Sequence, residues 1–281
     1  MTHPLAGNQL RIRIRADAER IVAARLERRT VSVARLMVGR PVGEIPGLVA
    51  SLLPICAASH RAAAMGAIET AAACPPQAIE ARAVAVLGER VANGVWRLGL
   101  DLPSSLGLPR LPAPVLAARD AARTLTGDRI TAGNALAALA GALADVAAIV
   151  DDAYDAAARF PSASGLEELA RRAADDPRHA LDSLRSVLAG TADPAPHAGL
   201  DGMVTTSRGA LDHRCMIADG IATDWSIHTP TDRIAAPDGP IAGALVGLPH
   251  GGRPFEAARI VTALHDPCED VAILLEDDAH A

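Results

Sequence analysis

The sequence predicts an α+β fold that is mainly helical, with a small β-hairpin near the N-terminus and another near the C-terminus. Half of the 281 residues are hydrophobic but only 2% are aromatic, a balance typical of alanine-rich helices rather than of a β-sandwich. Residues 10–15 alternate strictly between apolar and arginine side chains. Asp219-Gly220 separates two apolar runs, which is a strong hairpin signal.

The N-terminal part of the chain begins with the alternating stretch. Its apolar residues share one face and its arginines the other, so we expect a half-buried strand with residues 21–28 as its hairpin partner after a turn near residues 16–19. Apolar residues at helical spacing over 46–73 predict a helix that stops before Pro75 and Pro76. A second helix is predicted over 78–100.

The rest of the chain is predicted to be helical except near its end. Four prolines favour a loop over 103–114, and segment 191–202 is the best candidate for a flexible linker within a single domain spanning residues 1–281. The other elements that we expect are helices over 114–125, 131–158, 164–189 and 255–264, strands over 210–217 and 221–229, a turn at 237–239 and an acidic end at 276–278.

Charge and composition exclude several classes of function. The net charge of -6 argues against a nucleic-acid partner, since phosphate binding needs a basic face. The longest uncharged stretch of interest, 130–144, is too short and too rich in alanine to span a membrane. The chain has no N-terminal segment typical of a signal peptide and no disulfide-framework spacing, so we expect a cytoplasmic protein.

Two short cysteine segments are the candidates for chemistry. Cys56 precedes His60 by four residues, which would place both on one helix face. Such a pair could bind a transition metal, or the imidazole could lower the pKa of the thiol. Cys268 lies beside His265. A cysteine in an apolar run is more often a small buried side chain, and spacing alone leaves both interpretations open.

The same segments resemble the first and last metal-binding motifs of NiFe-hydrogenase large subunits. Cys56 and His60 match the second cysteine and the histidine of Arg-x-Cys-Gly-x-Cys-x-x-x-His, and Cys268 matches the first cysteine of Asp-Pro-Cys-x-x-Cys-x-x-His. Further landmarks fall in the same order along the chain, namely Gly39-Arg40-Pro41, Leu100-Asp101-Leu102-Pro103, Arg208-Gly209 with His213, and Pro230-Thr231 with Pro237-Asp238-Gly239.

The departures from this pattern are as informative as the matches. Leu53 and Val271 stand where the family has its other two cysteines, and Leu274 stands where it has the last histidine. Ala34 aligns with the glutamate that relays protons. The resemblance therefore implies that no complete nickel site is present and that the chain is not an enzyme.

This pattern is similar to that of the HupK/HoxV group of hydrogenase maturation proteins, degenerate relatives of the large subunit. The resemblance implies a large-subunit-like helical core that carries an iron–dicyano–carbonyl unit on Cys56 and Cys268, with His60, Arg208 and Thr231 contacting it. The implied partners are hydrogenase maturation proteins and the hydrogenase large subunit. The alternatives are a metal-free docking subunit and an oxidoreductase with reduced ligation.

Some polar residues are given no part in this site. His213 is expected to hold its hairpin, and Glu89 to be solvated or paired on a helix. Cys74, Cys215 and His265 are left without a role.

Overall fold

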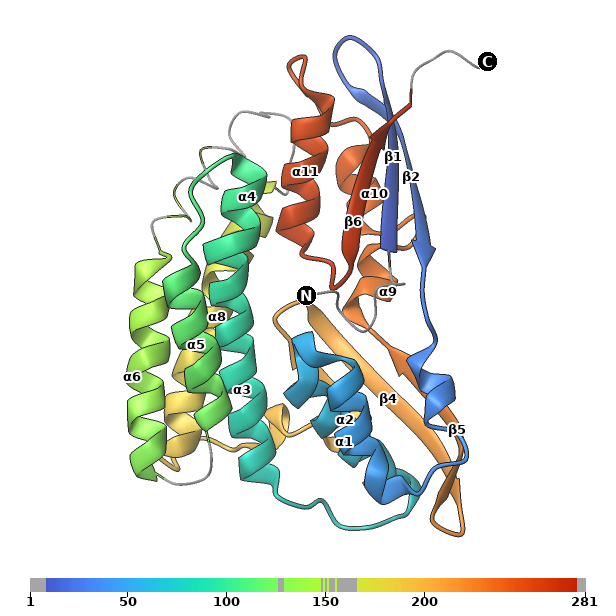
Figure 1. Ribbon diagram of the computed structural model, residues 1–281, viewed down its shortest axis with the longest axis vertical. Coiled ribbons are helices and arrows are strands. Elements are labelled where there is room, and N and C mark those ends of the chain that lie inside the picture. The colour runs from blue at the N-terminus through green and yellow to red at the C-terminus, as the bar shows by residue number, and fades with distance from the viewer. Residues whose placement is uncertain are drawn as a thin grey trace.

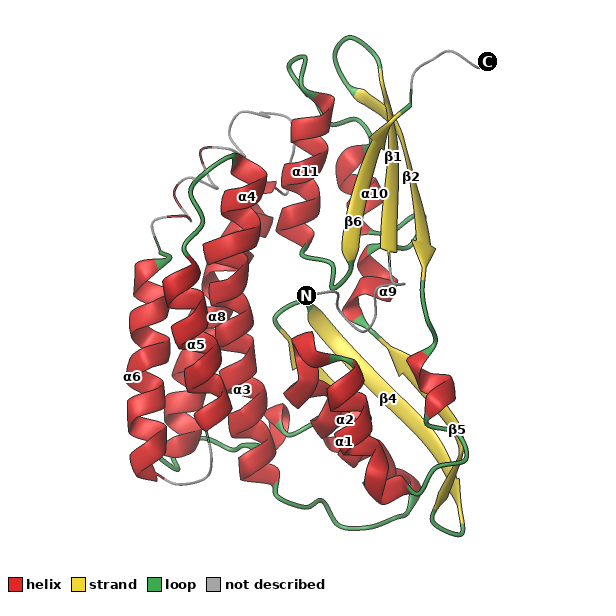
Figure 2. Cartoon of the chain, viewed as in Figure 1, coloured by secondary structure: helices red, strands yellow, loops and turns green. Residues whose placement is uncertain are grey.

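A helical bundle packs beside two small β-sheets, as Figure 1 shows for this computed structural model. The structure describes residues 9–125, 129–147, 149, 151, 155 and 166–276. In Figure 2 the bundle forms one side of the molecule, and the strands lie on the other. The mainly helical α+β fold predicted from composition is confirmed.

The first sheet joins the two ends of the chain. Strand β1 (Gln9–Ala16) pairs antiparallel with β2 (Ile21–Arg29), and β6 (Asp270–Leu275) pairs parallel with β1, giving the order β2-β1-β6. Leu10, Ile12 and Ile14 are fully buried, as the alternation predicts. The predicted hairpin is therefore correct, but sequence reasoning missed β6, which brings the segment after Cys268 beside the N-terminal strand.

The predicted helix over 46–73 is broken in the middle. Helix α1 (Ile45–Leu52) ends just before Pro54, a short 3-10 turn follows, and helix α2 (Ala57–Ala71) then starts in a new direction, bent by 103° from the preceding segment. Pro54 has no N–H for the helix and its ring would clash with the preceding turn. The break matters because it places Cys56 at the start of α2.

The predicted end of the second helix, at residue 100, is wrong. Helix α3 (Ile79–Trp96) continues through a π-helical turn at Arg97–Asp101 into α4 (Leu102–Leu106). Pro103 follows directly after the π-helical turn, and the Gly99 carbonyl, four residues before it, accepts the N–H of Leu111 at 2.8 Å instead. The expected loop over 103–114 shrinks for this reason, and α5 (Pro112–Thr124) starts on a proline.

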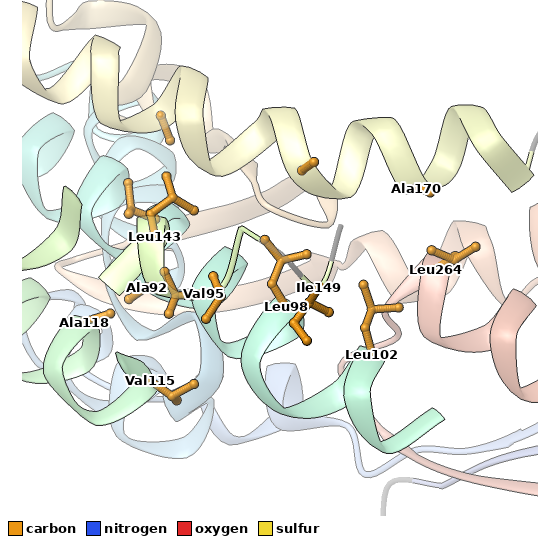
Figure 3. Close-up of a cluster of buried hydrophobic side chains, with 14 of the residues drawn as sticks. Ala92, Val95, Leu98, Leu102, Val115, Ala118, Leu143, Ile149, Ala170 and Leu264 are labelled. Atoms are coloured by element: carbon orange, nitrogen blue, oxygen red, sulfur yellow. The ribbon is translucent and has the colours of Figure 1, made fainter. Parts of the chain in front are cut away.

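Helices α6 (Arg129–Asp145) and α8 (Leu166–Leu188) complete the bundle. The helix predicted over 131–158 is interrupted by a turn at residues 146–147, and most of its remaining length lies outside the described residues. Helices α3 and α8 approach closely, since a Cβ at Gly94 would lie 2.5 Å from Pro177. Figure 3 shows the apolar core where these helices meet, including Val95, Leu98, Val115, Leu143 and Leu264.

The second sheet follows the segment that composition marks as a linker. Residues 195–202 of that segment form two 3-10 turns, and they pack so tightly on α2 that a Cβ at Gly66 would lie 1.8 Å from the Gly199 carbonyl oxygen. Strands β3 (Met203–Thr206), β4 (Gly209–Ala218) and β5 (Ile221–His228) then form an antiparallel sheet. Asp219 and Gly220 both have positive φ, as the predicted tight hairpin requires.

Three short helices close the chain before β6. They are α9 (Pro230–Ile234), α10 (Pro240–Leu245) and α11 (Pro254–His265). The sequence predicts only the last. Within the residues that the structure describes, no single helix meets the length and hydropathy of a membrane span; one pair, the two segments bent at Pro54, meets them only when taken together.

Candidate functional site

Cys56 and Cys268 meet in the fold although more than 200 residues separate them in the chain. Both are reduced, and their side chains share a hydrogen bond. Cys56 is buried, and Cys268 is partly exposed. The prediction that these two cysteines could serve one site therefore has a geometric basis.

Local structure at the start of α2 fixes the position of Cys56. Its backbone is non-helical, with φ -123° and ψ 45°, and the helix begins at the next residue. The carboxylate of Glu89, on α3, accepts the N–H groups of Ala58 and Ser59 at 2.6 and 3.0 Å, which satisfies donors that the helix start leaves free. Asn93, one turn farther along α3, donates to the Ile55 carbonyl at 3.1 Å and faces the Cys56 sulfur at 3.9 Å.

Cys268 lies on the short connection between α11 and β6. Asp266 ends α11 in the left-handed conformation, with φ 51°, and turns the chain toward the sheet. The N–H of Cys268 donates to the hydroxyl of Thr231 at 3.1 Å, and the same hydroxyl hydrogen-bonds to the Cys268 sulfur. Thr231 is buried at the start of α9.

Arg28 fastens this connection to the neighbouring elements. From the end of β2, its guanidinium binds Asp232 of α9 at 2.6 Å and Glu269 beside Cys268 at 3.1 Å. Asp232 in turn forms a capping box with Thr229 at the start of α9. The Thr231 hydroxyl and the Cys268 backbone are therefore held by a shared network.

Arg208 brings a buried positive charge to the two sulfurs. It lies in the tight turn between β3 and β4, and its Nη1 lies 3.6 Å from the Cys56 sulfur. Its Nε donates to the Asp266 carbonyl at 3.1 Å and lies 3.0 Å from the Asp266 carboxylate. The Arg208 side chain is 4% exposed and that of Asp266 is 6% exposed. Arg208 does not pair with Asp212, which pairs with Arg214 and His228 instead.

Two further charged groups from the π-helical turn after α3 lie near this ion pair. Burial and the neighbouring Asp266 carboxylate raise the pKa of Asp101 to about 6. Burial lowers the pKa of Arg97, whose guanidinium donates to the Leu264 carbonyl. Burial alone would lower the pKa of Arg208 as well, but the charges of Asp266 and the two cysteines outweigh it and raise that pKa well above its usual value.

The two cysteines differ in how they hold a proton. The hydrogen bond with Cys268, together with burial, raises the pKa of Cys56 well above its usual value. The same hydrogen bond lowers the pKa of Cys268, and Arg208 and the Thr231 hydroxyl lower it further, against the effect of burial. Of the two, Cys268 therefore loses its proton at the lower pH, and the thiolate is the form that ligates metals.

His60 is engaged elsewhere. Its Nδ1 lies 2.9 Å from Nε2 of His213, and both rings are buried. Burial lowers the pKa of His60 to about 4 and that of His213 well below its usual value, so both rings are neutral at neutral pH. His213 also packs edge-on against Trp225 at 5.9 Å. His213 thus joins its hairpin to α2, and contact between His60 and a bound group stays a prediction.

A complete metal cage is not part of the described structure. Among the residues it covers, no group of three or more His, Cys, Asp and Glu side chains is placed to hold a metal ion. The apolar residues at the positions of the family's other cysteines cannot bind a metal. Leu53 packs beside the core under α1, and Val271 is 37% exposed on β6. Two thiolates suit a metal that brings strong ligands of its own, rather than a bare ion that needs four.

The remaining cysteines and His265 lie outside the sulfur pair. Cys74 is exposed beyond the end of α2, and Cys215 on β4 packs beside the core under α1. Nδ1 of His265 hydrogen-bonds to the Val261 carbonyl within α11 at 2.8 Å.

Sequence reasoning missed the carboxylates that organise this site. Asp266 and Asp101 appear there only as parts of motifs, and Glu89 only as a side chain on a helix. The available signal was Arg208 itself, because a buried guanidinium needs a partner. Which carboxylate supplies it depends on contacts between residues 58 positions apart in the chain.

Comparison with known proteins agrees with the resemblance seen in the motifs. The chain is 29% identical to the hydrogenase expression/formation protein HupK of Rhodobacter capsulatus, over 97% of this chain and 99% of that protein. It is 33% identical to the protein of the same name from Azotobacter vinelandii over 176 residues, which are 61% of this chain and 46% of that protein. No protein-family model matches the chain.

Solved structures with a similar fold include NiFeSe hydrogenases. The as-isolated enzyme of Desulfovibrio vulgaris Hildenborough superposes with a TM-score of 0.62 at 12% identity, covering 90% of this chain and 94% of that chain. The reduced enzyme of Desulfomicrobium baculatum gives 0.63 at 12% identity, covering 91% and 95%. At this identity the likeness shows the fold alone, and it confirms the large-subunit-like core predicted from the motifs.

Proposed function

We propose that this chain, a HupK-type relative of the hydrogenase large subunit, acts in hydrogenase formation as a carrier of an iron–dicyano–carbonyl unit. The observation that supports the proposal most strongly is the meeting of Cys56 and Cys268 beside the buried guanidinium of Arg208. The role is that of a non-catalytic accessory protein, and the iron unit is its cargo.

The donor set suits such a cargo. An iron that already carries three diatomic ligands needs few protein ligands, and two thiolates can supply them. The permanent positive charge and planar donor fork of Arg208 suit an anionic complex. Thr231 holds the backbone and the sulfur of Cys268 in place. To bind iron through both sulfurs, Cys56 must give up its proton, because the ligand is the thiolate.

The expected partners follow from the fold. A protein with a large-subunit-like surface and fewer metal ligands could contact the maturation proteins that serve the hydrogenase large subunit. It would then pass the iron unit to the large subunit itself.

Infrared spectroscopy tests the carrier function directly. The protein is produced together with the hydrogenase maturation machinery and purified without oxygen. We expect cyanide and carbonyl bands in the wild type and in Cys74→Ser, whose exposed cysteine lies outside the site. We expect their loss in Cys56→Ser and in Cys268→Ser. Circular dichroism and urea unfolding establish that each variant is folded.

A metal-free docking subunit is the second candidate. It is favoured by the lack of a three-ligand group among the described side chains and by the closed His60–His213 pair. Bands missing from the folded wild type, with hydrogenase maturation still dependent on the protein, would reject the carrier and support this alternative. Normal maturation in a folded Cys56→Ser variant would also reject the carrier.

A further inference from the structure

The two sulfurs of the site are each other's partner when no cargo is bound. Cys56 and Cys268 are reduced and share a hydrogen bond, and the polar groups around them are the Arg208 guanidinium, the Asn93 amide and the Thr231 hydroxyl. Among the four cysteines of the chain, only these two are in contact within the described structure. Such a pair has chemistry of its own besides metal binding.

We propose that Cys56 and Cys268 form a reversible disulfide in the cargo-free protein, and that this bond switches the site off under oxidising conditions. The oxidant is a low-molecular-weight disulfide such as oxidised glutathione. The bond itself depends only on the sulfur pair. Its consequence, exclusion of the iron unit, rests on the proposed carrier function.

The difference in exposure between the two residues sets the order of the steps. Cys268 is partly exposed, whereas Cys56 is buried. The Cys268 thiolate attacks one sulfur of the small disulfide, which forms a mixed disulfide and releases one small thiolate. Cys56 then loses its proton and attacks the Cys268 sulfur, which releases the second small thiolate. The two protein sulfurs are oxidised by two electrons and the small disulfide is reduced to two thiolates. The Cys56 proton passes to one of these thiolates, and the other takes up a proton from water.

One neighbour of the pair assists the second step. The Arg208 guanidinium, 3.6 Å from the Cys56 sulfur, lies where negative charge develops as that thiol loses its proton. A nearby arginine stabilises a thiolate. The other two cysteines lack this arrangement, since Cys74 is exposed past the end of α2 and Cys215 packs against apolar residues.

The backbone positions of the two cysteines also allow the bond. Cys56 lies in the short turn between α1 and α2, and Cys268 lies in the connection between α11 and β6. Neither is inside a regular helix or strand. Closing the two sulfurs to bonding distance therefore moves two connecting segments and not the interior of a helix or strand.

The test needs no iron. Full-length protein is reduced, freed of reductant under anaerobic conditions, and incubated with mixtures of oxidised and reduced glutathione. After quenching with an alkylating agent, mass spectrometry of intact protein and of peptides reports the products. We expect loss of two hydrogens and a linked peptide pair containing Cys56 and Cys268, reversed by dithiothreitol. The Cys74→Ser and Cys215→Ser variants should behave like the wild type in this respect.

A trapped intermediate makes the test sharper. In Cys56→Ser the second step cannot occur, so a glutathione adduct should accumulate on Cys268. Modification of Cys74 in the wild type shows that the reagent is active. If Cys74 is modified while Cys56 and Cys268 stay free, or if other cysteine pairs are linked, the inference is wrong.

Iron loading separates this inference from the carrier function. A disulfide without infrared bands in the reduced, folded protein would support the switch chemistry and reject the carrier. Bands without a disulfide would do the reverse. If both hold, oxidised protein should show no bands after exposure to the maturation machinery, and reduction should restore them.

Discussion

Removal of Arg208 should destabilise the protein mainly through the partner that it leaves behind. In Arg208→Met the carboxylate of Asp266, 6% exposed, loses the guanidinium 3.0 Å away. Breaking a buried ion pair by removing one partner costs about 3 to 5 kcal/mol. Arg97 is the remaining arginine that acts on Asp266, and its side chain is tied to the Leu264 carbonyl. We therefore expect a loss in this range.

Removal of the carboxylate instead of the guanidinium should destabilise the protein less. In Asp266→Asn the guanidinium of Arg208 still faces Cys268 and Asp101, so the loss should be about 1 to 3 kcal/mol, the usual effect of an unsatisfied buried group. The double variant removes both charges and should be no less stable than Arg208→Met alone. The coupling energy between the two positions is then at least as large as the loss in Asp266→Asn, about 1 to 3 kcal/mol, which exceeds the roughly 0.5 kcal/mol within which independent sites add.

Urea unfolding of the four proteins under reducing conditions measures this coupling. Arg208→Lys is the matched control, because it keeps the charge but loses the planar fork that reaches both Asp266 and Cys56. Losses that add to within about 0.5 kcal/mol would refute the reasoning, since additivity is the behaviour of sites that do not interact. So would a loss below about 1 kcal/mol in Arg208→Met, the size expected of an exposed pair.

Three further predictions concern pH and packing, and each is read by urea unfolding. Burial lowers the pKa of His60 from 6.5 to about 4, so the unfolded chain takes up this proton first as pH falls. The free energy of unfolding should therefore drop by up to about 3 kcal/mol between pH 6.5 and pH 4. The variant His60→Gln should show a smaller drop over the same range. The pKa of Asp101 is raised from 3.8 to about 6, so stability should fall as pH rises through that range. Asp101→Asn should therefore stabilise the protein by about 1 to 3 kcal/mol at neutral pH but not near pH 4. Equal effects at the two pH values would contradict a raised pKa for Asp101. Gly66→Ala places a Cβ 1.8 Å from the Gly199 carbonyl oxygen and should lower the free energy of unfolding by more than about 2 kcal/mol. Gly133→Ala, at a helix position with open space around it, should be neutral or stabilising by up to about 1 kcal/mol. Similar effects of the two substitutions would contradict the close packing of Gly66 on Gly199.

Local pattern was enough to predict the elements whose side chains alternate or repeat. The strand over 10–15 and the hairpin at Asp219-Gly220 follow from period-two alternation and a turn pair that accepts positive φ. Strand β6 does not show such a pattern, because Asp270–Leu275 is nearly continuous in apolar residues. It becomes a strand by parallel pairing with β1, a contact between the two ends of the chain that no local signal records.

Prolines led to wrong helix boundaries of two kinds, a helix end that was missed and a loop that was expected in error. Pro54 lies inside a stretch with unbroken helical spacing, and yet it ends α1. Pro103 and Pro112 lie in the expected loop, but Pro103 follows the π-helical turn within a continuing helix and Pro112 lies in the first turn of α5. The physical difference is position, because a proline in the first turn loses no hydrogen bond and one farther along does. Sequence shows the proline but not the turn to which it belongs.

Some residues of the candidate site could be predicted from the sequence and others could not. Cys56, Cys268, Arg208 and Thr231 could be chosen from the motifs, and the fold brings them together. Their supporting carboxylates could not be chosen, because Asp266 becomes the partner of Arg208 only when the turn before β4 meets the end of α11. Motifs therefore predict which groups meet, and the fold shows what holds them.

The contrast between the retained and the altered positions bears on whether the two cysteines are only packing residues. Where the family pattern has its other cysteines and its last histidine, this chain has leucine and valine. A buried ion pair is often replaceable by apolar side chains at no cost in stability. The fold nevertheless keeps the Arg208–Asp266 pair against two sulfurs, with Asp101 held at a raised pKa beside it. Packing alone gives no reason for a charge where an apolar cluster would serve, whereas the anionic cargo that we propose would give one.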